Sequence, residues 1–453
     1  MRGKQQKNQL ELAFEGSAEV KPQAEHRKGT ETLTAEGKPE SQAGNPRLME
    51  EILEKENLKR ALRRVEQNKG AAGVDGMEVG ELRTYLKQHW PKLREALESG
   101  NYKPQAVRRV EIPKSGGGVR KLGIPTAVDR FIQQAVMQVL QGEWDQTFSD
   151  HSYGFRPGRT AHQAIDQAQE YINAGYKIVV DIDLEKFFDR VNHDVLMSRV
   201  ARRVTDKRVL KLIRAYLNSG VLEDGLVSPT NEGAPQGGPL SPLLSNLLLD
   251  DLDRELERRG HRFVRYADDC NIYVRSERAG ERVMEGLKRF LGRRLKLKVN
   301  EQKSAVGKPS KRKFLGYSYT SEEPARRRIA PQSVERFKER VRELTGRGRA
   351  VPDIVKDLSL YLRGWVGYYG RTEWRSQLRE LDEWVRRRLR LNIWRAWRRP
   401  RRRYRQLRRG GNSPRQAWRV VHFGPWRASR SQALSRVLPN AYFQRLGLYS
   451  MTA

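Results

Sequence analysis

Two adjacent aspartates, Asp268 and Asp269, lie at the tip of what otherwise looks like a pair of short strands, in the stretch FVRYADDCNIYV. Side by side, two carboxylates repel each other by about 1 kcal/mol at ~4 Å in water, and by roughly 4 kcal/mol at a partly buried site. In isolation the pair would be an ordinary polar turn. A second acidic stretch, VVDIDLE, favours another interpretation, because it places Asp181 and Asp183 on one face of a predicted strand.

One of these strand aspartates, brought to the Asp268–Asp269 pair, would gather three carboxylates. Divalent cations between the carboxylates would make that arrangement favourable, and Mg²⁺ prefers a few carboxylates together with substrate phosphates. The same ligand set serves two-metal phosphoryl transfer, in which ions ~3.5–4 Å apart activate the attacking oxygen and stabilise the leaving one. The residue types therefore indicate phosphoryl transfer.

The composition of the 453-residue chain favours a nucleic-acid partner. Lysine and arginine total 89 against 55 aspartates and glutamates, which gives a formal net charge of +34. Such a surplus destabilises a compact protein by self-repulsion unless a polyanion neutralises it, and binding to nucleic acid releases counterions. An anionic membrane is the weaker alternative, because no run of about 18 apolar residues exists. We expect a soluble, cytoplasmic protein with no membrane partner.

Cysteine and histidine usage argues against zinc. Cys270 is the only cysteine, which excludes internal disulfides and Cys-rich zinc modules. The seven histidines show no HExxH or HxxxH grouping. A hard cation on carboxylates remains the expected metal.

The elements that position the aspartates are predicted to be short strands between helices. Alternating residues around a glycine turn predict a β-hairpin over 107–123. A second hairpin over 263–275 carries Asp268 and Asp269 at its turn, where aspartate tolerates left-handed backbone conformations. Strands joined by such short connections pair antiparallel, so the fold class is α+β, or mixed α/β, and not a doubly wound parallel sheet.

The chain divides into four predicted segments. Residues 1–45 are polar and low in aromatics, which predicts a flexible extension. Residues 46–325 contain the strands and both acidic stretches. Apolar residues at helical spacing mark 331–409, and a basic segment follows over 410–453.

An arginine-rich run over residues 386–409 contains thirteen arginines and no acid. The run is interleaved with Trp394, Trp397 and Tyr404, which suits phosphate contacts and stacking on RNA bases. The alternative is that these aromatics pack within their own domain while the arginines stay solvated.

The motifs also follow a known order. FVRYADD resembles the Y-x-D-D hairpin of reverse transcriptases, and IVVDIDLEKFFDRVNHD resembles the strand and helix that carry their other metal-binding aspartate. NKGAAGVDG, SYGFRPGRTAHQAI, GAPQGGPLSPLLSN, LKVNEQK and FLGYSY stand in the order expected of group II intron-encoded reverse transcriptases (maturases). GYYG, LDEWVRRRLR and IWRAWRRP resemble the thumb or maturase domain of that family.

The resemblance covers roughly residues 47–453 and is to the bacterial, compact type that lacks an endonuclease. Relatives with an endonuclease carry a C-terminal Cys/His module, whereas here no cysteine follows Cys270 and His422 is the only later histidine. The resemblance implies a right-hand polymerase, with fingers and palm containing an antiparallel sheet, followed by an all-helical thumb and a basic C-terminal domain.

The implied function is RNA-directed DNA polymerase activity, together with binding of a group II intron RNA to assist splicing and retrohoming. Implied partners are structured intron RNA, an RNA or DNA template with its primer, and dNTPs; the oligomeric state stays open. One alternative is a repurposed relative in DNA repair or phage defence. Another is a non-catalytic RNA-binding splicing cofactor, although a binder has no need of three mutually repelling carboxylates.

The resemblance also assigns catalytic residues, which would hold two Mg²⁺ ions, with Mn²⁺ as a substitute. The catalytic aspartates are Asp183, Asp268 and Asp269, and the metal ligands are these three together with the backbone carbonyl of Leu184. The family places the first aspartate five residues before a Phe-Asp pair, and Asp183 meets this spacing with Phe188. The strand period alone leaves Asp181 open.

Six further residues would bind the incoming nucleotide: Lys114, Arg120, Phe188, Gln236, Asn300 and Lys303. Lys114 and Arg120 flank the glycine turn of the first hairpin and would contact the triphosphate, although hairpin-edge cations are common. Phe188 would pack beneath the sugar and exclude a ribose 2′-hydroxyl, with a core aromatic as the alternative. Gln236 lies in a glycine-rich loop whose backbone can approach a ligand closely.

Nucleic-acid binding is expected along the arginine-rich run. The expected contacts are Arg386, Arg387, Arg395, Arg398, Arg399, Arg401, Arg402 and Arg403. FLGYSY would correspond to the primer-grip region.

Overall fold

The computed structural model describes residues 45–113, 118–223, 226–228, 232–234, 236–346 and 348–452. Residues 1–44 of the predicted flexible extension lie outside the described residues. The chain divides into two compact units between Lys308 and Pro309. Their described parts are here called the strand-rich unit (45–308) and the helical unit (309–452). The division falls before the predicted palm boundary at residue 325, so the FLGYSY motif belongs to the helical unit.

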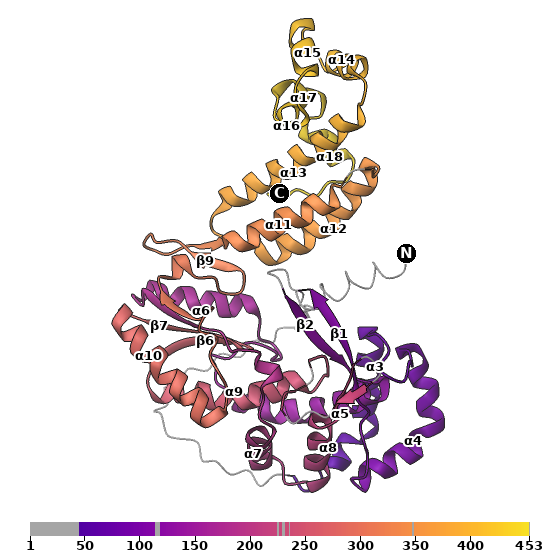
Figure 1. Cartoon of the computed structure of the whole chain (residues 1–453), viewed down its shortest axis with the longest axis vertical. Coiled ribbons are helices and arrows are strands. Elements are labelled where there is room, and N and C mark those ends of the chain that lie inside the picture. Colours follow the sequence, from indigo (N-terminus) through magenta and orange to yellow (C-terminus); the bar gives the residue numbers. More distant parts are fainter. Residues whose placement is uncertain are drawn as a thin grey trace, which may run out of the picture. The chain divides into compact units, whose positions relative to one another are not determined.

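A four-stranded sheet in the strand-rich unit carries both acidic stretches (Figure 1). The strand order is β6-β7-β3-β8, and every neighbouring pair is antiparallel. Its strands are β3 (Ile178–Ile182), β6 (Arg262–Tyr266), β7 (Asp269–Val274) and β8 (Ala305–Gly307). The predicted hairpin over 263–275 is thus confirmed as β6 and β7, and the predicted α+β class is confirmed with it.

Helices pack against this sheet because its strands are apolar on both faces. Ile178, Val179 and Val180 are all buried, as expected of a central strand. The packed helices are α6 (Ala161–Asn173), α9 (Ser241–Arg258) and α10 (Glu277–Phe290). Gly280 lets α10 approach closely, since a Cβ there would lie 2.5 Å from the Val306 side chain.

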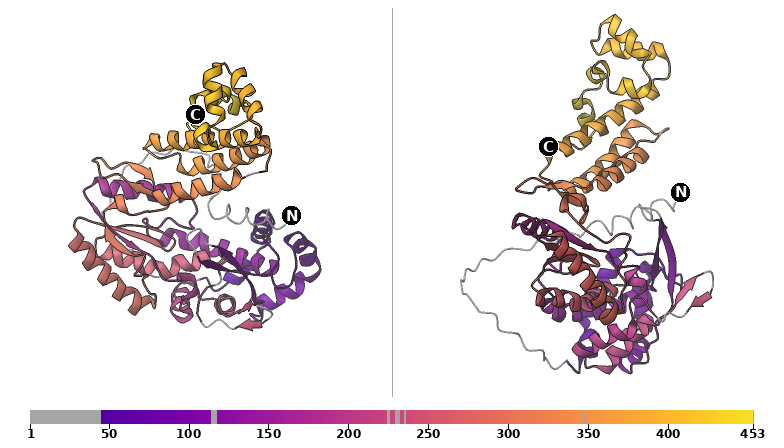
Figure 2. Two further views of the ribbon diagram at one scale, coloured as in Figure 1. Left: turned by 45° about the horizontal axis from the view of Figure 1, so that its top comes forward. Right: turned by 60° about the vertical axis from the view of Figure 1, so that its left-hand side comes forward.

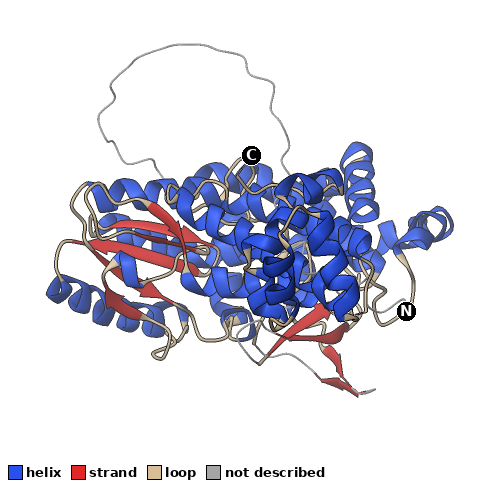
Figure 3. Ribbon diagram, turned by 90° about the horizontal axis from the view of Figure 1, so that it is seen from above, coloured by secondary structure: helices blue, strands red, loops and turns tan. Residues whose placement is uncertain are grey.

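A second sheet has the order β2-β1-β4-β5, and Figure 3 shows the strands gathered in separate groups among helices. Its strands are β1 (Val107–Pro113), β2 (Val119–Ile124), β4 (Val221–Glu223) and β5 (Leu226–Ser228). β1 and β2 pair antiparallel as far as Pro113 and Val119, which confirms the predicted first hairpin. Its turn, including Lys114, lies outside the described residues.

The other helices of the strand-rich unit form its remaining core. They are α2 (Leu48–Ile52), α3 (Lys55–Asn68), α4 (Leu82–Glu98), α5 (Ala127–Trp144), α7 (His193–Arg203) and α8 (Lys207–Leu217). α5 begins after Thr126, whose hydroxyl accepts a hydrogen bond from the Asp129 amide, as an N-cap does. α5 is buried along most of its length and packs on α3.

The helical unit starts with a two-stranded ribbon and continues as helices (Figure 2). The ribbon is β9 (Tyr317–Tyr319) and β10 (Arg327–Ile329). The helices are α11 (Pro331–Leu344), α12 (Val351–Tyr369), α13 (Arg375–Ala396), α14 (Pro400–Arg409), α15 (Pro414–Val421), α16 (Pro425–Ser429), α17 (Gln432–Val437) and α18 (Asn440–Arg445). Aromatic rings fill its core, with the Phe337 and Trp365 ring centroids 4.5 Å apart.

The aromatics of the arginine-rich run lie mostly inside this core. Trp394 is 0% exposed and Trp397 8% exposed, while Tyr404 is half-buried. For the two tryptophans the packing alternative therefore holds, and neither can stack on an RNA base without leaving the core.

Among the described residues, no helix is both long enough and apolar enough to span a bilayer.

Candidate active site and nucleic-acid surface

The register of the central strands brings the two acidic stretches together. Ile182, the last residue of β3, pairs with Cys270 in β7. Asp183 follows β3 directly after this last pair, and Asp269, the first residue of β7, directly precedes Cys270. Asp268 precedes Asp269 in the turn, and the charge of Asp183 contributes to the raised pKa of Asp268. The three predicted catalytic aspartates therefore share one end of the sheet.

The hairpin turn differs in detail from the prediction. Tyr266 pairs with Asp269, so the two turn residues are Ala267 and Asp268. The left-handed residue is Ala267, with φ +58°, not either aspartate. A residue with a Cβ in this conformation costs roughly 1–2 kcal/mol. The turn is thus strained at the position before Asp268, and surrounding contacts must hold it.

Asp268 is a half-buried carboxyl with an altered pKa. Burial raises the pKa of Asp268, and the neighbouring Asp183 raises it further. Arg120 and Arg265 act in the opposite direction and lower it. Arg120 lies on β2 of the first hairpin, so the hairpin presents a cation within electrostatic range of the acidic turn. Its contact with a triphosphate stays a prediction.

The backbone of Asp183 is clamped by a distant segment. The Asp183 amide donates to Ser304 Oγ at 2.9 Å, and the Ser304 hydroxyl lies 3.3 Å from the Asp183 carbonyl. The Asn300 amide donates to that same carbonyl at 2.8 Å. Ser304 was missed from the sequence, where it follows the LKVNEQK motif without any signal of its own.

Asn300 and Lys303 flank this clamp. The Oδ1 atom of the Asn300 side chain accepts a hydrogen bond from the Gln302 backbone amide at 3.2 Å. This side-chain oxygen therefore stabilises the turn. Lys303 Nζ lies 3.9 Å from Asp183 Oδ2. Of the two predicted nucleotide contacts, Lys303 therefore presents its charge at the acidic site, whereas Asn300 positions the backbone.

The Leu184 carbonyl is left out of the strand ladder. Leu184 forms an isolated antiparallel bridge with Val299. The hydrogen bonds of this bridge use the carbonyls of Asp183 and Lys298, which flank the bridged pair. The geometry therefore leaves the Leu184 carbonyl oxygen available beside Asp183.

Asp181 occupies a different environment from Asp183. It lies within β3, paired with Asn271 on one side and Ala305 on the other. Its charge contributes, with that of Asp269, to the raised pKa of Cys270, of which burial is the main cause. The charge of Asp183 is among the main causes that raise the pKa of Asp268, after burial.

The three carboxylates do not form a closed ligand cluster. Within the described residues, no group of three or more His, Cys, Asp or Glu side chains is close enough to hold a metal ion. Mutual repulsion of the carboxylates gives a physical reason for their spread. Their oxygen donors still match the chemistry of Mg²⁺, which uses few protein ligands and completes its shell with substrate phosphates and water.

Phe187 and Phe188 have separate environments. Phe187 is 2% exposed and belongs to the core, whereas Phe188 is half-buried and packs on its edge. Their ring centroids are 5.1 Å apart with planes at 72°. The sequence expectation that only one of them could face the cleft fits Phe188.

The glycine-rich loop over 233–238 connects Phe188 with the first hairpin. The Ala234 amide donates to the Phe188 carbonyl at 2.7 Å, and the Gly123 amide donates to the Gln236 carbonyl at 2.8 Å. Gly237 has φ +130°, and a Cβ there would lie 2.6 Å from the Gly123 carbonyl oxygen. The loop thus holds the half-exposed Gln236 beside the base of the hairpin.

The predicted nucleic-acid arginines divide into two groups. Arg386 pairs with Asp382, Arg387 lies 3.0 Å from Glu383, and Arg403 stacks over Trp394 at 4.7 Å. Arg395 is half-buried. The exposed members are Arg398, Arg399, Arg401 and Arg402.

An exposed tryptophan was missed from the sequence. Trp418 on α15 is 66% exposed. It lies within residues 384–453, which contain 19 arginines and no lysine, aspartate or glutamate. The complete lack of acids over 70 residues was the available signal.

Two family models match this chain. A family model described as "Reverse transcriptase (RNA-dependent DNA polymerase)" matches residues 112–319. A second, "Group II intron, maturase-specific domain", matches residues 334–411. The first match contains the acidic sheet, and the second contains the whole arginine-rich run over 386–409.

Curated relatives match over a similar region. "Protein YkfC" of Escherichia coli (strain K12) is 34% identical over 300 residues, which are 57% of this chain and 79% of YkfC. "Group II intron-encoded protein LtrA" of Lactococcus lactis subsp. cremoris is 29% identical over 316 residues, covering 55% of this chain and 52% of LtrA. A chain of the solved "Partial Cas6-RT-Cas1--Cas2 complex" is 27% identical, with a TM-score of 0.36, and covers 54% of this chain and 42% of that one.

Proposed function

The chain belongs to the group II intron-encoded reverse transcriptases and maturases, and we propose that Asp183, Asp268 and Asp269 form its polymerase centre. The family activity is RNA-directed DNA polymerisation together with a role in intron splicing. The observation that supports the residue assignment is the β3–β7 register, which ends at the pair Ile182–Cys270, beside Asp183 and Asp269.

Members of this family use divalent metal ions, and the donors here fit Mg²⁺. Carboxylate oxygens of the three aspartates and the carbonyl of Leu184 are hard ligands at one end of the sheet. Ions held by these oxygens would supply Lewis acidity at the primer 3′-hydroxyl and positive charge for the pyrophosphate. The raised pKa of Asp268 means that burial and the charge of Asp183 disfavour its ionised form. A bound cation would stabilise that form.

Protein cations and an aromatic ring would orient the dNTP. Arg120 on the hairpin and Lys303 beside Asp183 present positive charge toward the acidic end, which suits the triphosphate oxygens. Phe188 would lie beneath the sugar, and Gln236 would contact the nucleotide or template. Positioning and fixed charge supply most of the catalysis in such transfers.

RNA binding would draw on the acid-free C-terminal region. The exposed arginines 398, 399, 401 and 402 can pair with phosphates. Exposed Trp418 offers a ring face for an unpaired base. Structured intron RNA and the template–primer duplex are both polyanions that this surface suits.

Primer extension on an RNA template tests the assignment. Asp268→Asn should abolish dNTP incorporation in the presence of Mg²⁺ while RNA affinity stays within twofold of wild type. Asp194→Asn is the matched control, because Asp194 is an exposed α7 residue paired with Arg214. Extension by Asp268→Asn at the wild-type rate would refute the site, and equal loss of extension and RNA binding would refute the separation of roles.

A further inference from the structure

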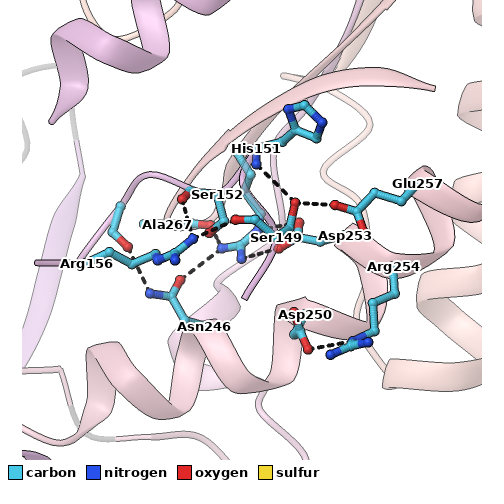
Figure 4. A network of polar contacts seen from close by, with 12 residues as sticks. Ser149, His151, Ser152, Arg156, Asn246, Asp250, Asp253, Arg254, Glu257 and Ala267 are labelled. Atoms are coloured by element: carbon cyan, nitrogen blue, oxygen red, sulfur yellow. Dashed lines mark hydrogen bonds and ion pairs between the residues drawn. The ribbon is translucent and has the colours of Figure 1, made fainter. Parts of the chain in front are cut away.

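A buried arginine, Arg265, contacts the backbone of the turn that carries Asp268. Arg265, in β6, has a side chain that is 0% exposed and lies two residues before the strained Ala267. Its guanidinium forms a bidentate pair with Asp253 of α9, at 2.7 and 2.5 Å. A wholly buried cation is costly unless it is paired and its remaining donors are used, and here those donors have specific targets. Figure 4 labels three of the residues that accept from this guanidinium, Asp253, Asn246 and Ala267.

One of these targets is the turn itself. Arg265 Nη1 donates to the Ala267 carbonyl at 2.8 Å and to Asn246 Oδ1 at 3.0 Å. The Ala267 carbonyl belongs to the peptide group that joins Ala267 to Asp268. A charged donor on that oxygen therefore fixes the peptide plane from which Asp268 projects, and it stabilises a left-handed conformation that alanine otherwise disfavours.

The SYGFRPG motif forms the second support. The Arg265 amide donates to the His151 carbonyl at 2.9 Å, and the Tyr153 amide donates to the Arg265 carbonyl at 2.8 Å. Residues 151–153 thus lie along the free edge of β6. Gly154 then passes so close to the turn that a Cβ there would lie 2.2 Å from the Ala267 backbone nitrogen.

Asn246 connects the two supports. Its Nδ2 donates to the Gly154 carbonyl at 2.8 Å, and its Oδ1 accepts from Arg265. The motif is itself ordered by Arg156, which contacts the Ser149 and Ser152 carbonyls at 2.6 and 2.9 Å and Asp145 at 2.9 Å. The turn therefore rests on an interlocked set of polar contacts from α9 and from the motif.

We propose that Arg265, with Asp253, Asn246 and Gly154, is a positioning unit that fixes the direction of Asp268 and Asp269 for catalysis. The inference rests on the proposed function of those two aspartates and adds a role for the SYGFRPG motif. A purely structural role would need no cation, because buried ion pairs are often replaceable by apolar side chains without loss of stability.

Two substitutions test the unit from opposite sides. Gly154→Ala adds a methyl group against the Ala267 backbone and leaves every hydrogen-bonding group in place. Arg265→Lys keeps the charge but loses the planar fork that reaches Asp253, Asn246 and Ala267 together. Both variants should lower kcat for primer extension at least tenfold, with the KM for dNTP and the RNA affinity within about twofold of wild type.

The mobility of the turn can be measured without an activity assay. Hydrogen–deuterium exchange of the peptide spanning β6 and β7 should quicken at residues 267–269 in both variants, in the absence of metal. The matched controls are Gly142→Ala, at an exposed α5 position with no atom within 4 Å of the added Cβ, and Arg254→Lys, whose guanidinium pairs with Asp250 on the same helix. Neither control substitution should change kcat or the rate of hydrogen–deuterium exchange at residues 267–269.

The outcomes separate this inference from the proposed function. If Asp268→Asn abolishes extension but Gly154→Ala and Arg265→Lys keep wild-type kcat, the positioning unit is wrong and the active site stands. A parallel loss of RNA binding and melting temperature in both variants would assign the unit to folding alone. Wild-type extension by Asp268→Asn would instead overturn the proposed function.

Discussion

At the scale of single residues, the adjacent Phe187 and Phe188 differ in burial, and we expect their substitutions to have different effects. Phe187 is a core residue, and Phe188 packs on it with one side half-exposed. Phe188→Ala should raise the ratio of ribonucleotide to deoxynucleotide kcat/KM, because the clash with a 2′-hydroxyl would be removed. Phe187→Ala should instead cost about 3–5 kcal/mol of unfolding free energy without changing sugar selectivity. Single-nucleotide incorporation and thermal denaturation distinguish the two, and selectivity altered only by Phe187→Ala would reverse the assignment.

A second residue-scale prediction concerns pH. Hydrogen bonds from Arg258, followed by those from Arg259, lower the pKa of Glu255 to about 2. A depressed carboxyl pKa contributes stability above its ordinary value of 4.5, and that contribution is lost as pH falls toward 2. Glu255→Gln should therefore destabilise the protein by about 1 kcal/mol at pH 7. Denaturant titrations should show this difference shrinking below pH 4.5, and a constant difference would contradict the ion-pair explanation.

At the scale of elements, the glycine-rich loop couples the first hairpin to the Phe188 segment. Gly237→Ala would force the loop away from Gly123, since its Cβ would lie 2.6 Å from the Gly123 carbonyl and its φ is +130°. We expect the KM for dNTP to rise several-fold, because Gln236 and the hairpin base would shift together. Gly292→Ala, which meets no atom within 4 Å, is the control. An unchanged KM for Gly237→Ala would argue that the loop does not shape the nucleotide site.

Local sequence patterns predicted some elements and could not predict others. The hairpins over 107–123 and 263–275 follow from alternation and turn residues, which act within a few positions. The left-handed Ala267 and the buried Arg265 depend on Gly154 and Asp253, whose contacts arise only when α9 and the SYGFRPG motif fold onto β6. The clamp from Ser304 on Asp183 is likewise set by packing across 121 positions.

At the scale of the whole molecule, charge should dominate RNA affinity. Replacing Arg398, Arg399, Arg401 and Arg402 with glutamine should weaken RNA binding and flatten its salt dependence, by roughly 0.7–0.9 in log–log slope for each phosphate that is no longer neutralised. The control replaces Arg340, Arg342 and Arg349, which already pair with carboxylates at 2.5–2.9 Å. Filter binding over a range of salt concentrations gives the slope of log affinity against log salt for each variant. Equal slopes for the two variants would contradict the proposal that the four exposed arginines bind RNA phosphates.

The contribution of Trp418 to RNA binding should not depend on salt, unlike that of the arginines. Trp418 is 66% exposed, and Trp418→Ala should reduce affinity for single-stranded RNA by about 1–3 kcal/mol, because its ring is removed. The salt slope should not change, because the same phosphates remain neutralised. Trp418→Phe, which keeps a ring face, should recover most of the affinity. A change in slope with no change in affinity at fixed salt would exclude a stacking role.

The order of the segments along the chain has a consequence for synthesis. Asp183 is held by Asn300 and Ser304, and β8 completes the edge of its sheet at residues 305–307. While the ribosome is still making these residues, the nascent chain has all three aspartates but lacks the segment that fastens the first of them. The contacts that hold the Asp183 backbone can therefore form only after residues 300–307 have been synthesised.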